Sequence, residues 1–232
     1  MKETLEKADK DELVSIASDL ENKSRLFKSS LDPDVLPGLN EKEIVALLRT
    51  IFSTRRKYNQ ILLDNPLDQL KEGIMDLLHQ EKDIQFRFQN FVSRIKEMDK
   101  GVKHEFASEL LHFYNPDQYW LWSRWIWDQD KKTGALPLVA TEGFDLTGNT
   151  VGETYLKVGK GIAFVNAVGE AAEFQFISRT LFGTDVFLSC VYSVYAYTVL
   201  RMRMTQEFNK IMPGLTEFSR RLLGVNKMKQ VA

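Results

Sequence analysis

Two pairs of an acidic residue and a histidine are the first candidates for chemistry in this sequence. Asp76 stands three residues before His79, and Glu109 stands three residues before His112. Residues three apart lie on one face of a helix, so each pair offers a carboxylate and an imidazole to one ligand. Glu-x-x-His pairs on two helices, with further glutamates from two others, hold the metals of di-iron bundles. Because one pair here has aspartate and the further ligands are unassigned, we favour structural roles over a metal site and name no cofactor.

An aromatic segment is the second candidate, because it holds all four tryptophans of the chain within eight residues. The residues that we single out for binding a ligand or a partner are Tyr114, Tyr119, Trp120, Trp122, Arg124, Trp125 and Trp127. The pattern predicts a helix over residues 118–128, whose side chains would point in nearly every direction and must be surrounded by protein or ligand. One interpretation is an aromatic platform for a planar ligand or a partner. The other is a core helix between two helical layers.

Arg124 lies inside this aromatic segment, where a guanidinium needs an acceptor. The acceptor is either a bound anion or a carboxylate of the chain, for which the candidates are Asp117, Asp128 and Glu105. On both interpretations we expect Arg124→Ala to destabilise or inactivate the protein far more than Lys229→Ala. Melting and binding assays on the two variants check this expectation, and equal tolerance of both would contradict it.

Three further motifs give weaker indications. Ser108 lies four residues from both His104 and His112, which places a hydroxyl between two imidazoles but supplies no oxyanion hole. Gly159-Lys160-Gly161 is part of a phosphate-loop pattern without the rest of it, so we favour a tight turn. Cys190 lies in an apolar run without a neighbouring histidine or cation, and we interpret it as a buried, unreactive thiol.

Composition and charge restrict the class of partner. The 232 residues are 44% hydrophobic and 27% charged, which suits a globular protein with a sizeable core. The formal net charge of -1 gives no general attraction to nucleic acid or anionic lipid. The first 34 residues nevertheless hold six Lys and Arg against nine Asp and Glu, whereas residues 201–232 hold seven against two. On one interpretation, the acidic N-terminal region pairs with the basic C-terminal region, within the chain or across a dimer. On the other, the basic region contacts nucleic acid through Arg201, Arg203, Arg220, Arg221, Lys227 and Lys229.

Hydrophobic periodicity predicts an all-α fold of about seven to nine helices in a single domain, residues 1–232. The predicted helices cover residues 11–31, 40–63, 66–98 as one long helix or a kinked pair, 102–114, 118–128, 150–182 with a break near Gly159, 186–208 and 213–223. Residues 1–38 are expected to form a peripheral N-terminal helix. Helix starts are indicated by Asn40 with Glu43, by Asn65 before Pro66, and by Thr150 with Glu153.

Residues 129–150 predict a long loop with a short extended piece over residues 135–140, because they include Gly134, Pro137, Gly143 and Gly148. Long loops in compact domains are often functional, although inert insertions also occur. The first residues do not form a secretory signal, and the apolar run over residues 186–200 is shorter than the roughly 20 residues of a bilayer span. With its single cysteine, the chain is expected to be cytoplasmic and away from membranes.

We therefore interpret the chain as a non-catalytic helical binding or accessory protein. Its aromatic segment and the adjacent loop would contact a partner protein, which is another protein or a second copy in a homo-oligomer, or a small ligand. One alternative is an enzyme or metalloprotein with a carboxylate and histidine site on the helices over residues 66–98 and 102–114, completed by His104, Glu105 and Arg124. A second alternative is nucleic-acid binding through the basic C-terminal region.

Overall fold

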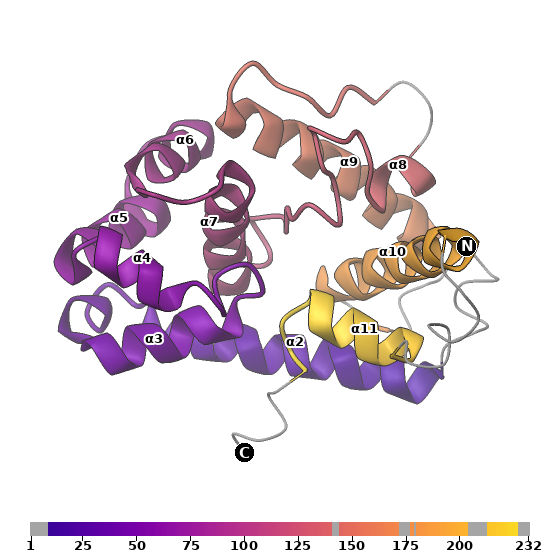
Figure 1. Cartoon of the computed structure of the whole chain (residues 1–232), viewed down its shortest axis with the longest axis horizontal. Coiled ribbons are helices and arrows are strands. Elements are labelled where there is room, and N and C mark those ends of the chain that lie inside the picture. Colours follow the sequence, from indigo (N-terminus) through magenta and orange to yellow (C-terminus); the bar gives the residue numbers. More distant parts are fainter. Residues whose placement is uncertain (1–8, 141–143, 172–176, 179, 204–212, 227–232) are drawn as a thin grey trace.

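The helix α7 (Lys100–Tyr114) lies near the centre of the fold and packs against α2, α5 and α6 (Figure 1). The computed structural model describes residues 9–140, 144–171, 177–178, 180–203 and 213–226. The remaining elements in this part of the chain are α2 (Lys10–Ser30), the 3-10 turn η1 (Leu36–Gly38), α3 (Glu41–Thr50), α4 (Tyr58–Asp64), α5 (Leu67–His79), α6 (Ile84–Arg94), α8 (Leu136–Val139), α9 (Val151–Ala171), α10 (Phe182–Arg203) and α11 (Leu215–Leu222). The described residues thus form ten α-helices and no strand, which confirms the all-α prediction.

Local capping explains several of the helix boundaries. The Asn40 side chain accepts a hydrogen bond from the backbone of Glu43, whose carboxylate accepts one in return from the Asn40 backbone, so the predicted capping box at the start of α3 is confirmed. At the start of α9, Thr150 Oγ1 accepts a hydrogen bond from the Glu153 backbone, as predicted. Gly224 ends α11 with a φ of 74°, a conformation that glycine adopts without steric cost.

Other boundaries differ from the prediction. The helix expected over residues 40–63 is divided into α3 and α4, because residues 51–57 form turns in which Thr54 donates a hydrogen bond to Leu48 O. The stretch 66–98 is a pair, α5 and α6. Asn65 does not cap α5; its side chain donates to Ile61 O and accepts from the Lys96 backbone, and so ties α4 to the end of α6.

The prediction of a helix over residues 118–128 is wrong. Residues 115–135 form turns and irregular backbone instead. Other elements satisfy part of this backbone: the Trp122 backbone N–H donates to Ser108 Oγ of α7 at 2.5 Å, and Trp120 O accepts from Tyr155 of α9 at 3.2 Å. Because side chains of two flanking helices satisfy these groups, they do not need helical hydrogen bonds.

The prediction of a break in α9 near Gly159 is also wrong, since the helix runs without interruption from Val151 to Ala171. A Cβ at Gly159 would lie 2.5 Å from Trp120 Cδ1, and one at Gly152 would lie 2.2 Å from Gln85 O of α6. These glycines therefore serve close packing rather than a turn. Residues 136–139 are helical, not extended, and α10 begins at Phe182, four residues earlier than predicted; residues 204–208 of its expected end lie outside the described residues.

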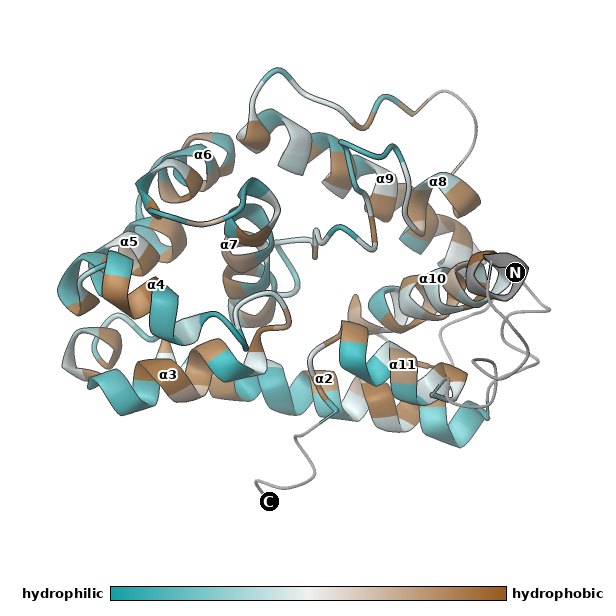
Figure 2. Cartoon of the chain, in the orientation of Figure 1, coloured by the Kyte–Doolittle hydropathy of each residue, from teal (hydrophilic) through white to brown (hydrophobic). Residues whose placement is uncertain are grey.

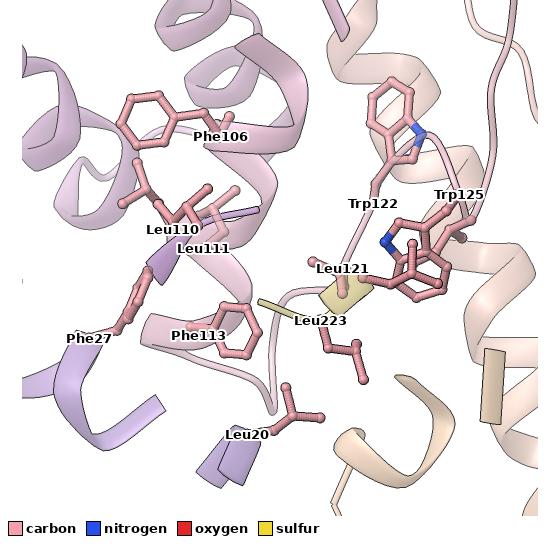
Figure 3. Close-up of a cluster of buried hydrophobic side chains, with 14 of the residues drawn as sticks. Leu20, Phe27, Phe106, Leu110, Leu111, Phe113, Leu121, Trp122, Trp125 and Leu223 are labelled. Carbon is pink, nitrogen blue, oxygen red and sulfur yellow. The ribbon is translucent and has the colours of Figure 1, made fainter. Parts of the chain in front are cut away.

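The N-terminal helix α2 contributes to the core. It packs along α7, α10 and α11, and buries Leu13, Ile16, Leu20 and Phe27 together with the charged Lys23. In Figure 3, Leu20 and Phe27 approach Phe113 of α7, while Trp122 and Trp125 lie across from them on the irregular segment. Figure 2 shows hydrophilic residues between the hydrophobic ones on α7 despite its central place. Among the helices of the described residues, none is long and apolar enough to span a bilayer.

Candidate functional site

Four buried charged or titratable groups lie inside the helical core, and we call them the buried charge cluster. Its members are Lys23 of α2, Glu109 and His112 of α7, and Asp185 of α10. The Lys23 side chain is 0% exposed, and the side chains of His112 and Asp185 are 0% and 2% exposed. Such groups are tolerated in a core only when they are paired and hydrogen-bonded. The cluster therefore fixes how three helices pack.

Lys23 is surrounded by groups that stabilise its charge. Its Nζ donates to Glu109 Oε2 at 2.8 Å and to Leu223 O at the end of α11 at 3.1 Å, and it lies 3.9 Å from the centre of the Phe113 ring. Burial lowers the pKa of Lys23 and raises the pKa of Glu109, while the attraction between the two charges opposes both shifts. Either charge would be strongly unfavourable without the other.

His112 is held between two acceptors. Its Nε2 lies 2.7 Å from Asp185 Oδ2 and its Nδ1 lies 2.8 Å from the carbonyl oxygen of Tyr119. Because a carbonyl and a carboxylate both accept, the protonated imidazolium, with two N–H groups, is the form that satisfies both. Burial alone would lower the pKa of His112, but the charge and hydrogen bond of Asp185 outweigh it, so that the pKa is raised. His112 is therefore a structural cation rather than a free base.

At the other end of α7, Glu105 and Arg124 form a third ion pair. Glu105 Oε1 accepts hydrogen bonds from the backbone N–H of Arg124 at 2.8 Å and from its Nε at 3.1 Å. This confirms Glu105 as the intramolecular acceptor for the arginine. Burial lowers the pKa of Arg124, but the Glu105 hydrogen bond and charge more than compensate and raise it. The Arg124 side chain is 44% exposed, so the guanidinium is held in place at the surface.

His104 stacks on the indole of Trp122 beside this ion pair, with ring centroids 4.0 Å apart. Burial lowers the pKa of His104 to about 3, and the charge of Arg124 acts in the same direction. The ring is therefore neutral at physiological pH. His104 hydrogen-bonds to the Lys100 backbone, while its Nε2 has no partner among the described residues.

The two acid–histidine pairs do not converge. Asp76 pairs with Arg94 at 2.6 Å, and the His79 ring lies 3.1 Å from Leu31 O, whereas Glu109 and His112 belong to the buried charge cluster. In the described part of the chain, no group of three or more His, Cys, Asp and Glu side chains is placed to hold a metal ion. Ser108 has a structural role as well, because its hydroxyl accepts from the backbone of Trp122.

The structure divides the aromatic residues that the sequence singles out. Trp122, Trp125 and Trp127 are 0%, 5% and 7% exposed and belong to the core. Tyr114, Tyr119 and Trp120 are partly buried against that core. Trp122, Trp125 and Trp127 therefore pack in the core and are not exposed for binding at the surface.

The following loop is attached to the aromatic segment through its backbone. Asp128 and Thr133 exchange backbone hydrogen bonds of 2.7 and 3.3 Å across a tight turn, and the Asp128 carboxylate accepts from two backbone N–H groups within that turn. The backbone N–H of Ala135 donates to Trp125 O at 2.8 Å, and that of Leu136 donates to Ile126 O at 3.0 Å. Leu136 is buried, whereas Leu138 is 50% exposed.

The basic C-terminal residues face the acidic start of the chain at one described point. Arg220 pairs with Asp19 of α2 and donates a hydrogen bond to Ser15. Arg221 pairs with Glu217 in its own helix. Lys227 and Lys229 lie outside the described residues, as do the side chains of Arg201 and Arg203.

Reasoning from sequence missed Lys23, Asp185 and Arg87. Lys23 stands three residues after Leu20 and four before Phe27, on the apolar face of α2. A cation on an otherwise apolar helix face indicates a buried ion pair, and this pattern could have identified Lys23. Arg87 is 8% exposed and donates to the carbonyl oxygens of Leu77 and Lys82 near the end of α5. Its position in α6 gave no comparable signal.

No family model matches the chain, and neither the curated proteins nor the solved structures include one with significant similarity to it.

Proposed function

We propose that this protein is a non-catalytic helical binding or accessory protein of the cytoplasm. It contacts a partner protein through a surface formed by the loop after the aromatic segment. We call this the loop surface, and its exposed residues are Asp130, Lys131, Lys132, Pro137 and Leu138, together with Arg124 of the aromatic segment itself. They combine two apolar side chains, Pro137 and Leu138, with three cations and one carboxylate, and a protein interface likewise has an apolar centre with a polar rim.

The observation that carries this proposal is the hydrogen bonding of residues 128–136 of the loop to one another and to the aromatic segment. Hydrogen bonds from Ala135 and Leu136 to the backbone of the aromatic segment, and the Asp128–Thr133 turn, fix the loop on a base of buried tryptophans. A loop that is ordered before binding loses little conformational entropy when it binds. Binding residues are commonly found on loops that a rigid scaffold positions.

The polar groups of α7 support a binding role over a catalytic one. Glu105, Glu109 and His112 are each engaged by a structural partner. A general acid or base needs a position from which it reaches a substrate, and these three side chains are at most 6% exposed.

Native mass spectrometry of the tagged chain, purified gently from its own cells, tests the proposal. We expect a second polypeptide to be retained by the unmodified protein and lost from Leu138→Asp. Leu63→Asp is the matched control, because Leu63 is 84% exposed on α4 and lies outside the loop surface. Far-UV circular dichroism should show that both variants fold. A bare protein in every sample, or a partner that Leu138→Asp retains, would overturn the proposal.

A further inference from the structure

The outward side of α9 is unusually apolar for a surface helix. The face consists of Leu156, Lys160, Ala163, Ala167 and Glu170, flanked by Phe164 and Val168, and we call it the α9 face. Leu156 and Val168 are 36% and 39% exposed, and Ala163 and Phe164 are partly exposed. The ring of Phe144, itself 37% exposed, lies 5.2 Å from that of Phe164 and extends the apolar area beyond the helix. Exposed apolar side chains that gather on one side of a helix are a feature of interaction sites.

The spacing of the α9 face is that of a helix–helix seam. Residues 156, 160, 163, 167 and 170 are separated by four, three, four and three positions. Residues with this alternating spacing lie in one line along a helix. Such a line forms the contact between two helices whose axes are nearly parallel or antiparallel. At the middle of the line stand Ala163 and Ala167, whose small side chains permit the two helix axes to approach closely.

The charges on the face are complementary to themselves. Lys160 and Glu170 are both exposed, carry opposite charges and lie five residues on either side of Val165. If two copies of α9 cross in antiparallel orientation at Val165, Lys160 of each copy faces Glu170 of the other, and Ala163 faces Ala167. Lys160 forms no ion pair among the described residues, whereas the neighbouring Lys157 is already bound to Asp145 and Glu153. Glu170 Oε1 accepts a hydrogen bond from Asn166 at 2.9 Å, so its Oε2 is the oxygen that would receive Lys160.

We propose that the α9 face is the interface of a twofold homodimer, with α9 packed antiparallel against the α9 of a second copy. Self-complementarity favours a second copy over an unrelated partner, because a twofold interface uses the same patch on both chains. The two Lys160–Glu170 pairs lie at the two ends of the interface and set the alignment of the two α9 helices. The apolar residues between these pairs supply the buried area. This inference goes beyond the proposed function and does not depend on the loop surface.

Sedimentation velocity on the purified full-length chain tests the interface, with four proteins compared at several concentrations. The unmodified chain is expected to dimerise. Lys160→Glu and Glu170→Lys each turn two attractive pairs into two repulsive ones, so each should raise the dimer dissociation constant by at least about tenfold. The double variant Lys160→Glu/Glu170→Lys restores opposite charges in the antiparallel register and should return the constant to within about threefold of the original.

Two controls make the result specific. Lys42→Glu reverses an exposed charge on α3 and should leave the dissociation constant unchanged. Ala167→Arg places a bulky cation at the centre of the face and should give a monomer, and its far-UV circular dichroism should match that of the unmodified chain because the position is exposed. An unmodified chain that is monomeric at high concentration overturns the proposal, as do single variants that dimerise normally. A double variant that stays as weak as the single ones overturns the antiparallel register.

Discussion

Removing the charge of Glu109 should strongly destabilise the protein. In Glu109→Gln the shape of the side chain is kept, but the fully buried ammonium of Lys23 loses the carboxylate 2.8 Å away and retains Leu223 O and the Phe113 ring. Breaking a buried ion pair by neutralising one partner costs about 3–5 kcal/mol. This is a large share of the roughly 5–15 kcal/mol that stabilises a typical domain. For a protein of this size it lowers the melting temperature by about 6–20 °C.

Urea unfolding followed by far-UV circular dichroism measures the change in unfolding free energy. Glu72→Gln is the matched control: Glu72 also pairs with an arginine, Arg94, but its side chain is 63% exposed, so its loss should cost less than about 1 kcal/mol. In the double variant Lys23→Met/Glu109→Gln the uncompensated charge is gone, and we expect it to be more stable than Glu109→Gln. A loss below about 1 kcal/mol for Glu109→Gln, or a double variant less stable than the single one, would refute the reasoning.

Two further perturbations follow from the packing and the charges. Folding raises the pKa of His112, so the protonated ring stabilises the native state. This stabilisation is complete at pH values below about 6.5, the pKa of histidine in the unfolded chain. It declines by up to about 1.4 kcal/mol per pH unit as the pH rises towards the pKa in the folded chain. The difference in unfolding free energy between the unmodified protein and His112→Asn should therefore be larger at pH 6 than at pH 9 in urea titrations, and a constant difference would contradict the raised pKa. Gly159→Ala places a Cβ 2.5 Å from the Trp120 ring and should lower the unfolding free energy by about 1–3 kcal/mol. In the same helix, the Cβ of Gly169→Ala meets no atom within 4 Å, and this variant should raise the unfolding free energy by up to about 1 kcal/mol. Thermal melts of the two alanine variants decide this, and equal melting temperatures would count against close packing of α9 on Trp120.

The fold class was predictable because it depends on local patterns. The capping box at Asn40 and Glu43 and the start of α9 at Thr150 involve residues within a few positions of one another, and their geometry follows from the helix itself. Apolar periodicity likewise identified most helices. Local patterns failed where another element satisfies the backbone, as Ser108 does for Trp122.

The candidate site was predictable in part. Glu105 was one of three carboxylates that the sequence indicated as acceptors for Arg124, and the structure pairs the two. The buried charge cluster was not predictable, because Lys23 and Glu109 are 86 residues apart and His112 and Asp185 are 73 apart. Both acid–histidine pairs have a spacing that suits a metal, but their partners lie on other elements. Asp76 pairs with Arg94 of α6 and His79 lies beside Leu31 O, while Glu109 and His112 pair with Lys23 and Asp185.

The position of Lys23 also determines when the chain can complete its fold. The ammonium needs Glu109, 86 residues further along, and Leu223 O, 200 residues further along. During synthesis, α2 therefore leaves the ribosome long before the last partner of its buried cation exists. Contacts of such high sequence separation form late and slow the overall folding rate. The native core is expected to be completed only after α11 has been released, so truncation before α11 leaves Lys23 of α2 without Leu223 O.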